Sequence, residues 1–178
     1  LRHPMPYGDL AHQRVQRFAT FDDIAAAGCT AEEREEYEPH IAAGNVVFAG
    51  VDYAAILAAA EDEADVIVWD GGNNDFPFIR PDLHIAIADA LRPDQVDTHH
   101  PGETVARMAD VVVINKVDAA TADAIAATEA AIRRVNPRAV VVQAASPVEV
   151  ADPAAVVGRR VLVVEDGPTT THGGMAYG

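Results

Sequence analysis

The sequence has 178 residues, of which 49% are hydrophobic and 23% are charged, and its formal net charge at pH 7 is −15. This composition excludes a disordered chain, and the length is enough for one domain with a hydrophobic core. The acidic balance predicts that the protein binds neither nucleic acid nor an anionic membrane surface.

The cysteine and lysine content narrows the class of protein further. A single cysteine, Cys29, excludes an internal disulfide framework and a cysteine zinc cluster. No apolar run approaches the roughly 18 residues of a membrane span, and no signal peptide opens the sequence, so we expect a cytoplasmic protein. The basic residues are twelve arginines and one lysine, Lys116, which fits either a salt-adapted (halophilic) cytoplasm or a GC-rich genome.

Short apolar runs rich in β-branched residues recur along the chain and predict strands that are buried on both faces. In chain order these predicted strands are Val46–Phe48, Val66–Trp69, His84–Ala88, Val111–Ile114, Val140–Val142 and Val161–Val164.

Helical stretches with N-terminal capping signals lie between the predicted strands. Thr30, Asp52 and Thr121 are predicted to cap helices over 31–38, 53–64 and 122–134. Shorter helices are predicted after Thr20 and from Pro101 to about residue 109.

Strands that alternate with helices predict an α/β fold with three layers, in which a mostly parallel sheet carries helices on both faces. We expect residues 1–178 to form one such nucleotide-binding domain. Ligands of these folds bind beyond the carboxyl ends of the strands, so the loops at those ends are the candidate sites.

The strongest functional signal is an apolar strand that runs directly into Asn115-Lys116-Val117-Asp118. The Asp118 carboxylate can accept hydrogen bonds from both N1–H and the N2 amino group of guanine. The Lys116 stem can lie across the base while its ammonium stays solvated, and the Asn115 amide can brace neighbouring loops. After the next predicted strand, backbone N–H groups of Ala145 and Ser146 can reach guanine O6. The pattern predicts a guanine-nucleotide site.

A second signal follows the strand predicted over 66–69, where Asp70 precedes Gly71-Gly72. A carboxylate at a strand end is a typical ligand of a Mg²⁺–phosphate site, and glycines let the backbone approach the γ-phosphate. A common turn has the same sequence, but the nucleotide motif elsewhere favours a metal-binding and catalytic Asp70. The adjacent Asn73-Asn74-Asp75 are predicted to add catalytic groups at a substrate wall.

A P-loop requires G-x-x-x-x-G-K-[ST], whose lysine reaches the β- and γ-phosphates. The single lysine belongs to the Asn115–Asp118 motif, so these 178 residues contain no P-loop. We expect both ends to be truncated, with the P-loop before Leu1 and the flanking domains of the same protein missing. The alternative is a degenerate nucleotide binder.

Two further segments concentrate chemically active side chains. Arg2 and His3 lie among prolines, as in a loop that contacts phosphate, although a plain surface loop has the same pattern. Near the other end, Thr169, Thr170 and His172 lie among carboxylates and glycines, and this density favours a functional loop with His172 as a catalytic candidate.

Several long segments carry a family resemblance. They are Arg2–Leu10, Val15–Thr20, Glu32–His40, Trp69–Phe78, Asn115–Asp118 and Val163–Gly174. Over essentially its whole length, the chain resembles the archaeal and bacterial predicted P-loop GTPases described as similar to cyclic 2,3-diphosphoglycerate synthetase. The resemblance implies the central part of a longer P-loop NTPase, without its first strand and P-loop.

The resemblance also implies an enzyme that binds and hydrolyses an NTP. The family's named reaction is the ATP-driven closure of an intramolecular phosphoanhydride in 2,3-diphosphoglycerate. Asn115–Asp118 favours GTP whereas the name implies ATP, so GTP or ATP, with Mg²⁺, remain open. An anionic diphosphoglycerate requires cations, and the candidates are Arg2, His3, Arg17, Arg80 and Arg92.

Three functions follow from these observations. The leading prediction is a GTPase-like NTP-hydrolysing enzyme. The alternatives are an ATP-dependent ligase that forms cyclic 2,3-diphosphoglycerate, and a nucleotide-sensing switch without net synthesis. A homo-oligomer is compatible with each of them.

Overall fold

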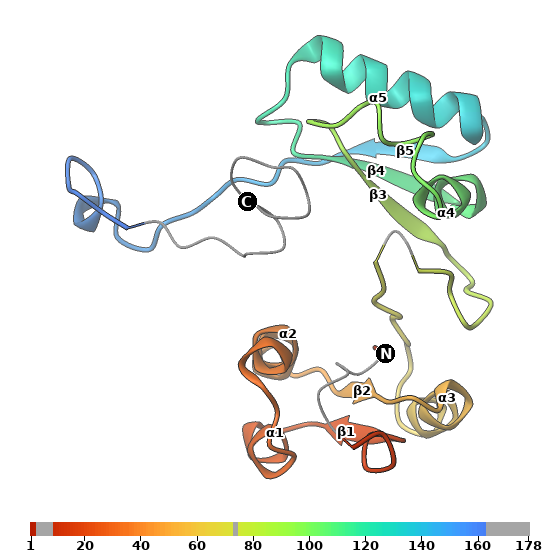
Figure 1. Ribbon diagram of the computed structural model, residues 1–178, viewed down its shortest axis with the longest axis vertical. Coiled ribbons are helices and arrows are strands. Elements are labelled where there is room, and N and C mark those ends of the chain that lie inside the picture. The colour runs from red at the N-terminus through yellow and green to blue at the C-terminus, as the bar shows by residue number, and fades with distance from the viewer. Residues whose placement is uncertain (3–8, 73–74, 163–178) are drawn as a thin grey trace. The chain divides into compact units, whose positions relative to one another are not determined.

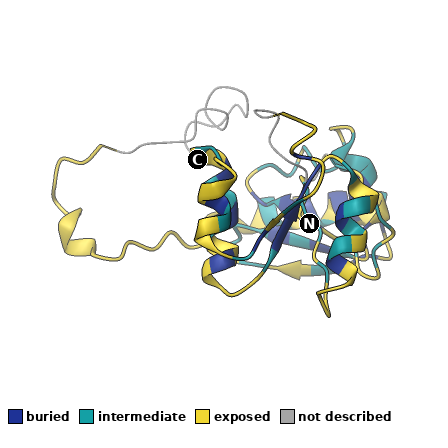
Figure 2. Cartoon of the chain, turned by 90° about the horizontal axis from the view of Figure 1, so that it is seen from below, coloured by how far each residue is buried: buried dark blue, intermediate teal, exposed yellow. Residues whose placement is uncertain are grey.

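The computed structural model describes residues 1–2, 9–72 and 75–162. The chain divides into two compact units, Leu1–Ser146 and Pro147–Gly178, and each is described by itself. In the second unit, residues 147–162 are exposed throughout and contain only a short 3₁₀ helix, η1 (Pro153–Ala155) (Figure 2).

The N-terminal part of the first unit is built around a short antiparallel pair of strands (Figure 1). Strand β1 (Gln16–Phe18) pairs with β2 (Val47–Ala49), so that Arg17 lies opposite Phe48. Three helices accompany this pair: α1 (Phe21–Ala26), α2 (Ala31–Ala42) and α3 (Tyr53–Glu61).

The capping signals in the sequence fix where these helices begin. The Thr30 hydroxyl accepts from the backbone N–H of Glu33 at 3.2 Å, while the Glu33 carboxylate accepts from the N–H of Thr30 at 2.8 Å. Thr20 and Asp23 form the same reciprocal capping box on α1, and Asp52 accepts from the N–H of Ala55 on α3. These three predicted helix starts are confirmed.

A small core holds β1, β2, α1 and α2 together. Its buried members are Phe18, Ile24, Tyr37, Ile41, Val47 and Ala49. The rings of Phe18 and Tyr37 stack with their centroids 5.0 Å apart. Burial, together with the nearby Glu33 carboxylate, raises the pKa of Tyr37 to about 12, so its phenol stays protonated at neutral pH.

The C-terminal part of the first unit is a parallel sheet with the strand order β3-β4-β5 (Figure 1). The strands are β3 (Ile85–Asp89), β4 (Val111–Asn115) and β5 (Val140–Gln143). The crossover helices are α4 (Gly102–Met108) and α5 (Ala122–Val135), which begins at the predicted cap Thr121. The predicted α/β fold with a parallel sheet is confirmed here.

Both helices cover the same face of this sheet. Ala86, Ala88, Val112 and Ile114 point into a core that also contains Val105 of α4 and Ile132 of α5. On the opposite face, Ile85 and Ile87 of β3 are each 52% exposed, and Val140 and Val142 of β5 are exposed as well. Within the described ranges, helices therefore cover one face of the sheet rather than the expected two.

A buried amide connects the end of α5 to α4. The Asn136 side chain donates to the carbonyls of Ala106 and Ala109 at 3.0 and 2.7 Å, and its Oδ1 accepts from the N–H of Ala139 at 3.1 Å. Asn136 is only 7% exposed, so loss of its amide leaves buried backbone groups without partners.

We expect Asn136→Ala to lower the free energy of unfolding by about 2–4 kcal/mol, because each unsatisfied buried group costs about 1–3 kcal/mol. Urea denaturation of the full-length protein measures this change. Arg138→Ala is the matched control, since Arg138 is exposed two residues away and should change stability by at most about 0.5 kcal/mol. Equal effects of the two substitutions would contradict a structural role for the Asn136 amide.

Two predicted strands differ from the structure, and one observed strand was missed. Val66–Trp69 is not part of a regular ladder: the nitrogen of Leu1 donates to the carbonyl of Val68 at 2.6 Å, and Val66 lies in a bend. Residues 161–162 are not in a strand, and the rest of Val161–Val164 lies outside the described residues. Strand β1 was not predicted, because its three residues include two polar side chains.

Candidate functional site

The Asn115–Asp118 loop leaves the carboxyl end of β4, as the sequence predicts. Lys116 adopts a left-handed backbone conformation with φ 61°, which turns the chain sharply beyond the strand. The loop after β5 runs beside it: the N–H of Ala144 donates to the carbonyl of Ile114 at 2.9 Å, and that of Val117 donates to the carbonyl of Ala144 at 3.2 Å. The loops that follow β4 and β5 therefore lie side by side at the carboxyl end of the sheet.

Asp118 and Ser146 meet across these two loops. Oδ1 of Asp118 accepts from the backbone N–H of Ser146 at 2.9 Å. Asp118 is exposed, and its second oxygen, Oδ2, has no hydrogen-bond donor among the residues that the structure describes. The carboxylate is thus fixed by one oxygen and presents the other outward, an arrangement that can accept hydrogen bonds from a ligand.

Asp89 is a member of this site that the sequence alone did not identify. The strand register places Asp89 beside Asn115, and its Oδ2 lies 3.1 Å from Nζ of Lys116. Its Oδ1 accepts from the N–H of Leu91 at 2.8 Å, while the N–H of Ala90 donates to the carbonyl of Asn115 at 3.1 Å. Asp89 therefore holds the Lys116 side chain at the carboxyl end of β3. The sequence signal that could have identified Asp89 was its position directly after a predicted apolar strand.

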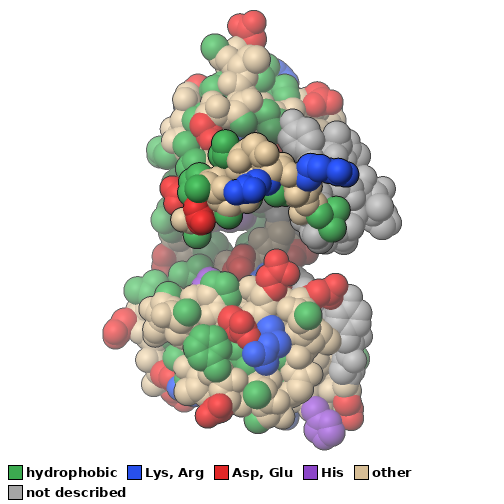
Figure 3. All heavy atoms as spheres, turned by 90° about the vertical axis from the view of Figure 1, so that its left-hand side faces the viewer, with side chains coloured by type: hydrophobic (Ala, Val, Ile, Leu, Met, Phe, Trp, Pro, Cys, Tyr) green, Lys and Arg blue, Asp and Glu red, His purple; other side chains and the backbone are tan. Residues whose placement is uncertain are grey.

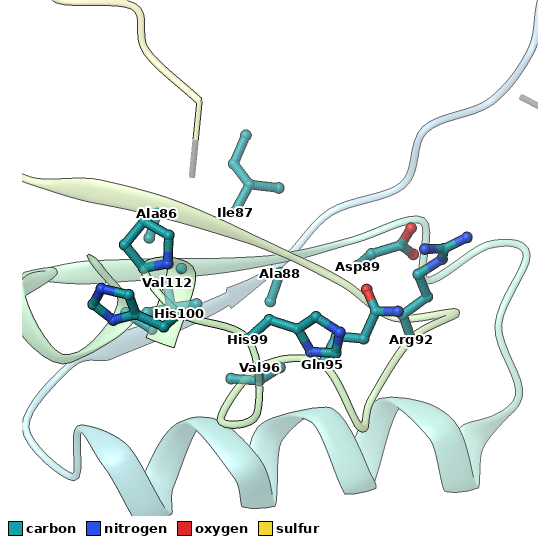
Figure 4. Close-up of a pocket in the computed structure, with 13 residues that line it drawn as sticks. Ala86, Ile87, Ala88, Asp89, Arg92, Gln95, Val96, His99, His100 and Val112 are labelled. Carbon is teal, nitrogen blue, oxygen red and sulfur yellow. The ribbon is translucent and has the colours of Figure 1, made fainter. Parts of the chain in front are cut away.

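A cavity of about 310 Å³ lies alongside β3 and the start of α4 (Figure 4). Asp89, Arg92 and Gln95 lie toward one end of it, and His99 and His100 lie farther along (Figure 4). The Arg92 guanidinium forms no ion pair with any residue within the described ranges. The Arg92 guanidinium and the Asp89 carboxylate, which is paired with Lys116, thus line the same cavity.

The Asp70 segment lies in the N-terminal part of the first unit. The Asp70 side chain is 51% exposed, and Nε of Arg2 lies 3.5 Å from its Oδ2. A Cβ on Gly71 would come within 2.5 Å of the Trp69 ring, so packing against Trp69 already accounts for a glycine there. Oδ2 of Asp75 accepts from the N–H of Gly72 at 3.1 Å and closes a turn.

No cluster of three or more metal-ligating side chains occurs among the residues that the structure describes. Mg²⁺ at Asp70 would therefore take several of its ligands from phosphates and water.

The predicted phosphate-contacting cations have different surroundings. Arg2 pairs with Glu36 at 2.7 Å, and Arg17 makes a two-pronged contact with the Glu63 carboxylate. Arg80 is exposed, and Arg92 lines the cavity beside β3. The other predicted site residues lie outside the described residues; they are His3, Asn73, Asn74, Thr169, Thr170 and His172.

The molecular surface reflects the net charge of −15. On the face seen in Figure 3, acidic side chains are scattered over the surface, and basic groups are few. In the part of the chain covered by the structure, no helix is long and apolar enough to cross a membrane.

Comparison with known proteins identifies the family. The model of the cyclic 2,3-diphosphoglycerate synthetase P-loop domain matches residues 39–145, which include β3, β4, β5 and the Asn115–Asp118 loop. The chain belongs to this family. It is 61% identical, over all of its 178 residues, to the arginine synthetase ArcE of Thermococcus kodakarensis, and it spans 40% of the length of that protein. No solved structure matches the chain.

These findings confirm the predicted resemblance to the cyclic 2,3-diphosphoglycerate synthetase family and support an enzyme with a P-loop-type nucleotide-binding domain. They do not support the GTPase part of that prediction, because both the family description and the relative name a synthetase. The ligase alternative fits better than hydrolysis.

Proposed function

We propose that this chain is the nucleotide-binding part of an NTP-dependent synthetase. The observation that carries the proposal is the Asp118 carboxylate, held through Oδ1 by the N–H of Ser146 and exposed through Oδ2 at the carboxyl edge of a parallel sheet. Ligands of parallel α/β sheets bind at this edge. Oδ1 keeps a second lone pair that can accept from N1–H of guanine, and Oδ2 can accept from the N2 amino group, which favours GTP over ATP as the bound nucleotide.

We propose arginine as the product of the synthetase. The support is the 61% identity to a protein named arginine synthetase, which extends over the whole chain. The cavity beside β3 adds a physical argument, because the Arg92 guanidinium lines it and can bind the α-carboxylate of an amino acid, while Asp89 already bonds to Lys116.

Cyclic 2,3-diphosphoglycerate is the second candidate product, favoured by the description of the family model. Its precursor is highly anionic and needs several convergent cations. Arg2 and Arg17 are already compensated by Glu36 and Glu63, however, and the sequence carries a net charge of −15. Of the candidate cations that the structure describes, Arg80 and Arg92 remain without an ion pair among the described residues, which is fewer than a highly anionic precursor needs.

The reverse reaction tests the proposal without knowledge of the forward substrates. Full-length protein is incubated with arginine, Mg²⁺, radiolabelled inorganic phosphate and either GDP or ADP. If arginine is a product and the NTP is cleaved to NDP, labelled NTP appears only when arginine is present. Lysine replaces arginine as the control. Parallel reactions with NMP and labelled pyrophosphate test cleavage of the NTP to NMP and pyrophosphate. Mass spectrometry of the compound formed from arginine identifies the forward substrate.

A forward reaction with NTP and 2,3-diphosphoglycerate, followed by phosphorus NMR, tests the second candidate. Formation of a cyclic phosphoanhydride without any arginine-dependent labelling would replace arginine by the diphosphoglycerate. If the protein releases phosphate from NTP and neither arginine nor 2,3-diphosphoglycerate changes the rate, the protein is an NTP hydrolase or a nucleotide-sensing switch.

A further inference from the structure

A groove of about 600 Å³ lies between the region of β2 and the segment Val66–Val68 in the N-terminal part of the first unit. Val46, Val47 and Phe48 form one wall, and Val66, Ile67 and Val68 form the other, with Leu1 at the end. Val66 and Val68 are 79% and 72% exposed, although both belong to a run whose composition is typical of a buried strand.

Leu1 and Arg2 already connect the two walls at one end of the groove. On one side, the N–H of Arg2 donates to the carbonyl of Phe48 at 2.9 Å, and the N–H of Gly50 donates to the carbonyl of Arg2 at 3.4 Å. These bonds place Arg2 beside Ala49 in a parallel bridge. Leu1 therefore lies beside Phe48.

The opposite wall has the same pattern. The nitrogen of Leu1 donates to the carbonyl of Val68 at 2.6 Å, and the N–H of Asp70 donates to the carbonyl of Leu1 at 3.0 Å. Leu1 thus bonds to the residues before and after Trp69, which is the pattern of a parallel ladder in which Leu1 pairs with Trp69. In a longer polypeptide, the peptide N–H of Leu1 makes the same bond to Val68.

The backbone groups farther along both walls face the groove. The N–H and C=O of one strand residue point to the same edge, and successive residues alternate between edges. Since the carbonyls of Phe48 and Val68 bond to Arg2 and Leu1, the N–H groups of Phe48 and Val68 point into the groove as well. The groove is therefore lined by the edge of β2 on one side and by backbone groups of the segment around Val68 on the other.

We propose that the polypeptide preceding Leu1 in the longer protein fills this groove as a parallel strand between β2 and Val66–Trp69. The chain spans 40% of ArcE, so a protein of that length has additional polypeptide to supply the strand. The direction is set by Leu1, whose nitrogen lies at the end of the groove. Apolar walls on both sides call for a strand with apolar side chains, typical of the interior of a parallel sheet.

The register follows from the bonds of Leu1 and Arg2. The residue immediately before Leu1 pairs with Val47, donates to the carbonyl of Val46 and accepts from the N–H of Phe48. The residue before that pairs with Ile67, donates to the carbonyl of Val66 and accepts from the N–H of Val68. Filling the groove converts Val66–Trp69 into an interior strand and fixes Asp70 at its carboxyl end. This inference does not depend on the identity of the substrate.

Hydrogen exchange in the full-length protein, resolved by residue, tests the strand. The amides of Phe48 and Val68 are expected to exchange at least about 100-fold more slowly than unstructured amides, because both donate to the added strand. In a second full-length protein, the four residues before Leu1 are replaced by Gly-Ser-Gly-Ser. There Phe48 and Val68 should lose at least about tenfold of their protection through loss of the apolar strand, while the amide of Ala144, in the other sheet, stays protected.

Two results would overturn the proposal. One is exchange of Phe48 and Val68 at the rate of unstructured amides in the unaltered full-length protein, which leaves the groove open. The other is protection that survives the replacement or that rises with protein concentration. Another segment or a second copy of the chain would then occupy the groove. The first measurement requires no variant, so a folding defect of the replaced protein does not obscure the answer.

Discussion

Replacing Asp118 with asparagine in the full-length protein should lower its affinity for GTP by about 10- to 100-fold and raise its affinity for XTP by a similar factor. Each mispaired or newly formed buried hydrogen bond corresponds to about 1–3 kcal/mol. Affinity for ATP should change little, since adenine lacks the donor edge that the Asp118 carboxylate reads.

The structure determines which way the new amide faces. The N–H of Ser146 donates to Oδ1 of Asp118, and only an oxygen can accept there. The asparagine therefore keeps its carbonyl toward Ser146 and turns its NH₂ group outward, into the position of Oδ2. Facing guanine, this NH₂ meets the N2 amino group, and two donors oppose each other. Xanthine has an oxygen at that position and can accept instead.

Equilibrium titration with fluorescent GTP, XTP and ATP analogues measures the three affinities. Asp123→Asn is the matched control, because Asp123 is an exposed aspartate in the first turn of the adjacent helix α5 and should leave all three affinities unchanged. A wild-type protein that prefers ATP, with no gain of XTP affinity in Asp118→Asn, would show that Asp118 does not read the base.

The second large effect is expected at Asp70. In the full-length protein, Asp70→Asn should reduce Mg²⁺-dependent turnover by about 100-fold or more, which corresponds to ~2.7 kcal/mol of transition-state stabilisation. Nucleotide binding without Mg²⁺ should change by less than about threefold, because the lost charge acts through the metal. The Asp70 carboxylate is half-exposed, and Arg2 approaches it only to 3.5 Å, so a metal ion can reach it.

Steady-state turnover and Mg²⁺-free nucleotide titration separate the two effects. Asp65→Asn provides the control at the opposite end of the same extended run, where the aspartate is exposed and has no predicted role. If both variants turn over at the wild-type rate, Asp70 belongs to a structural turn. If both lose activity and stability alike, the effect arises from folding of the run rather than from the metal.

Local chemistry in the sequence was sufficient to predict the helices and most of the sheet. Helices α1, α2, α3 and α5 begin after Thr20, Thr30, Asp52 and Thr121, because each of these side chains bonds to a backbone N–H within three residues. Strands β3, β4 and β5 were visible as apolar runs. The proximity of Asp118 and Ser146 also followed from sequence, since adjacent parallel strands bring their carboxyl ends to one edge.

Tertiary structure decided the features that depend on partners distant in sequence. Whether Val66–Trp69 becomes a strand depends on which backbone occupies the groove beside it, and its own residues do not encode that. The ion pair of Lys116 with Asp89 and the compensation of Arg17 by Glu63 join residues 27 and 46 positions apart. An apolar run or a capping residue acts on its immediate neighbours, whereas a charge or a strand edge acts on whatever the fold places within a few ångströms.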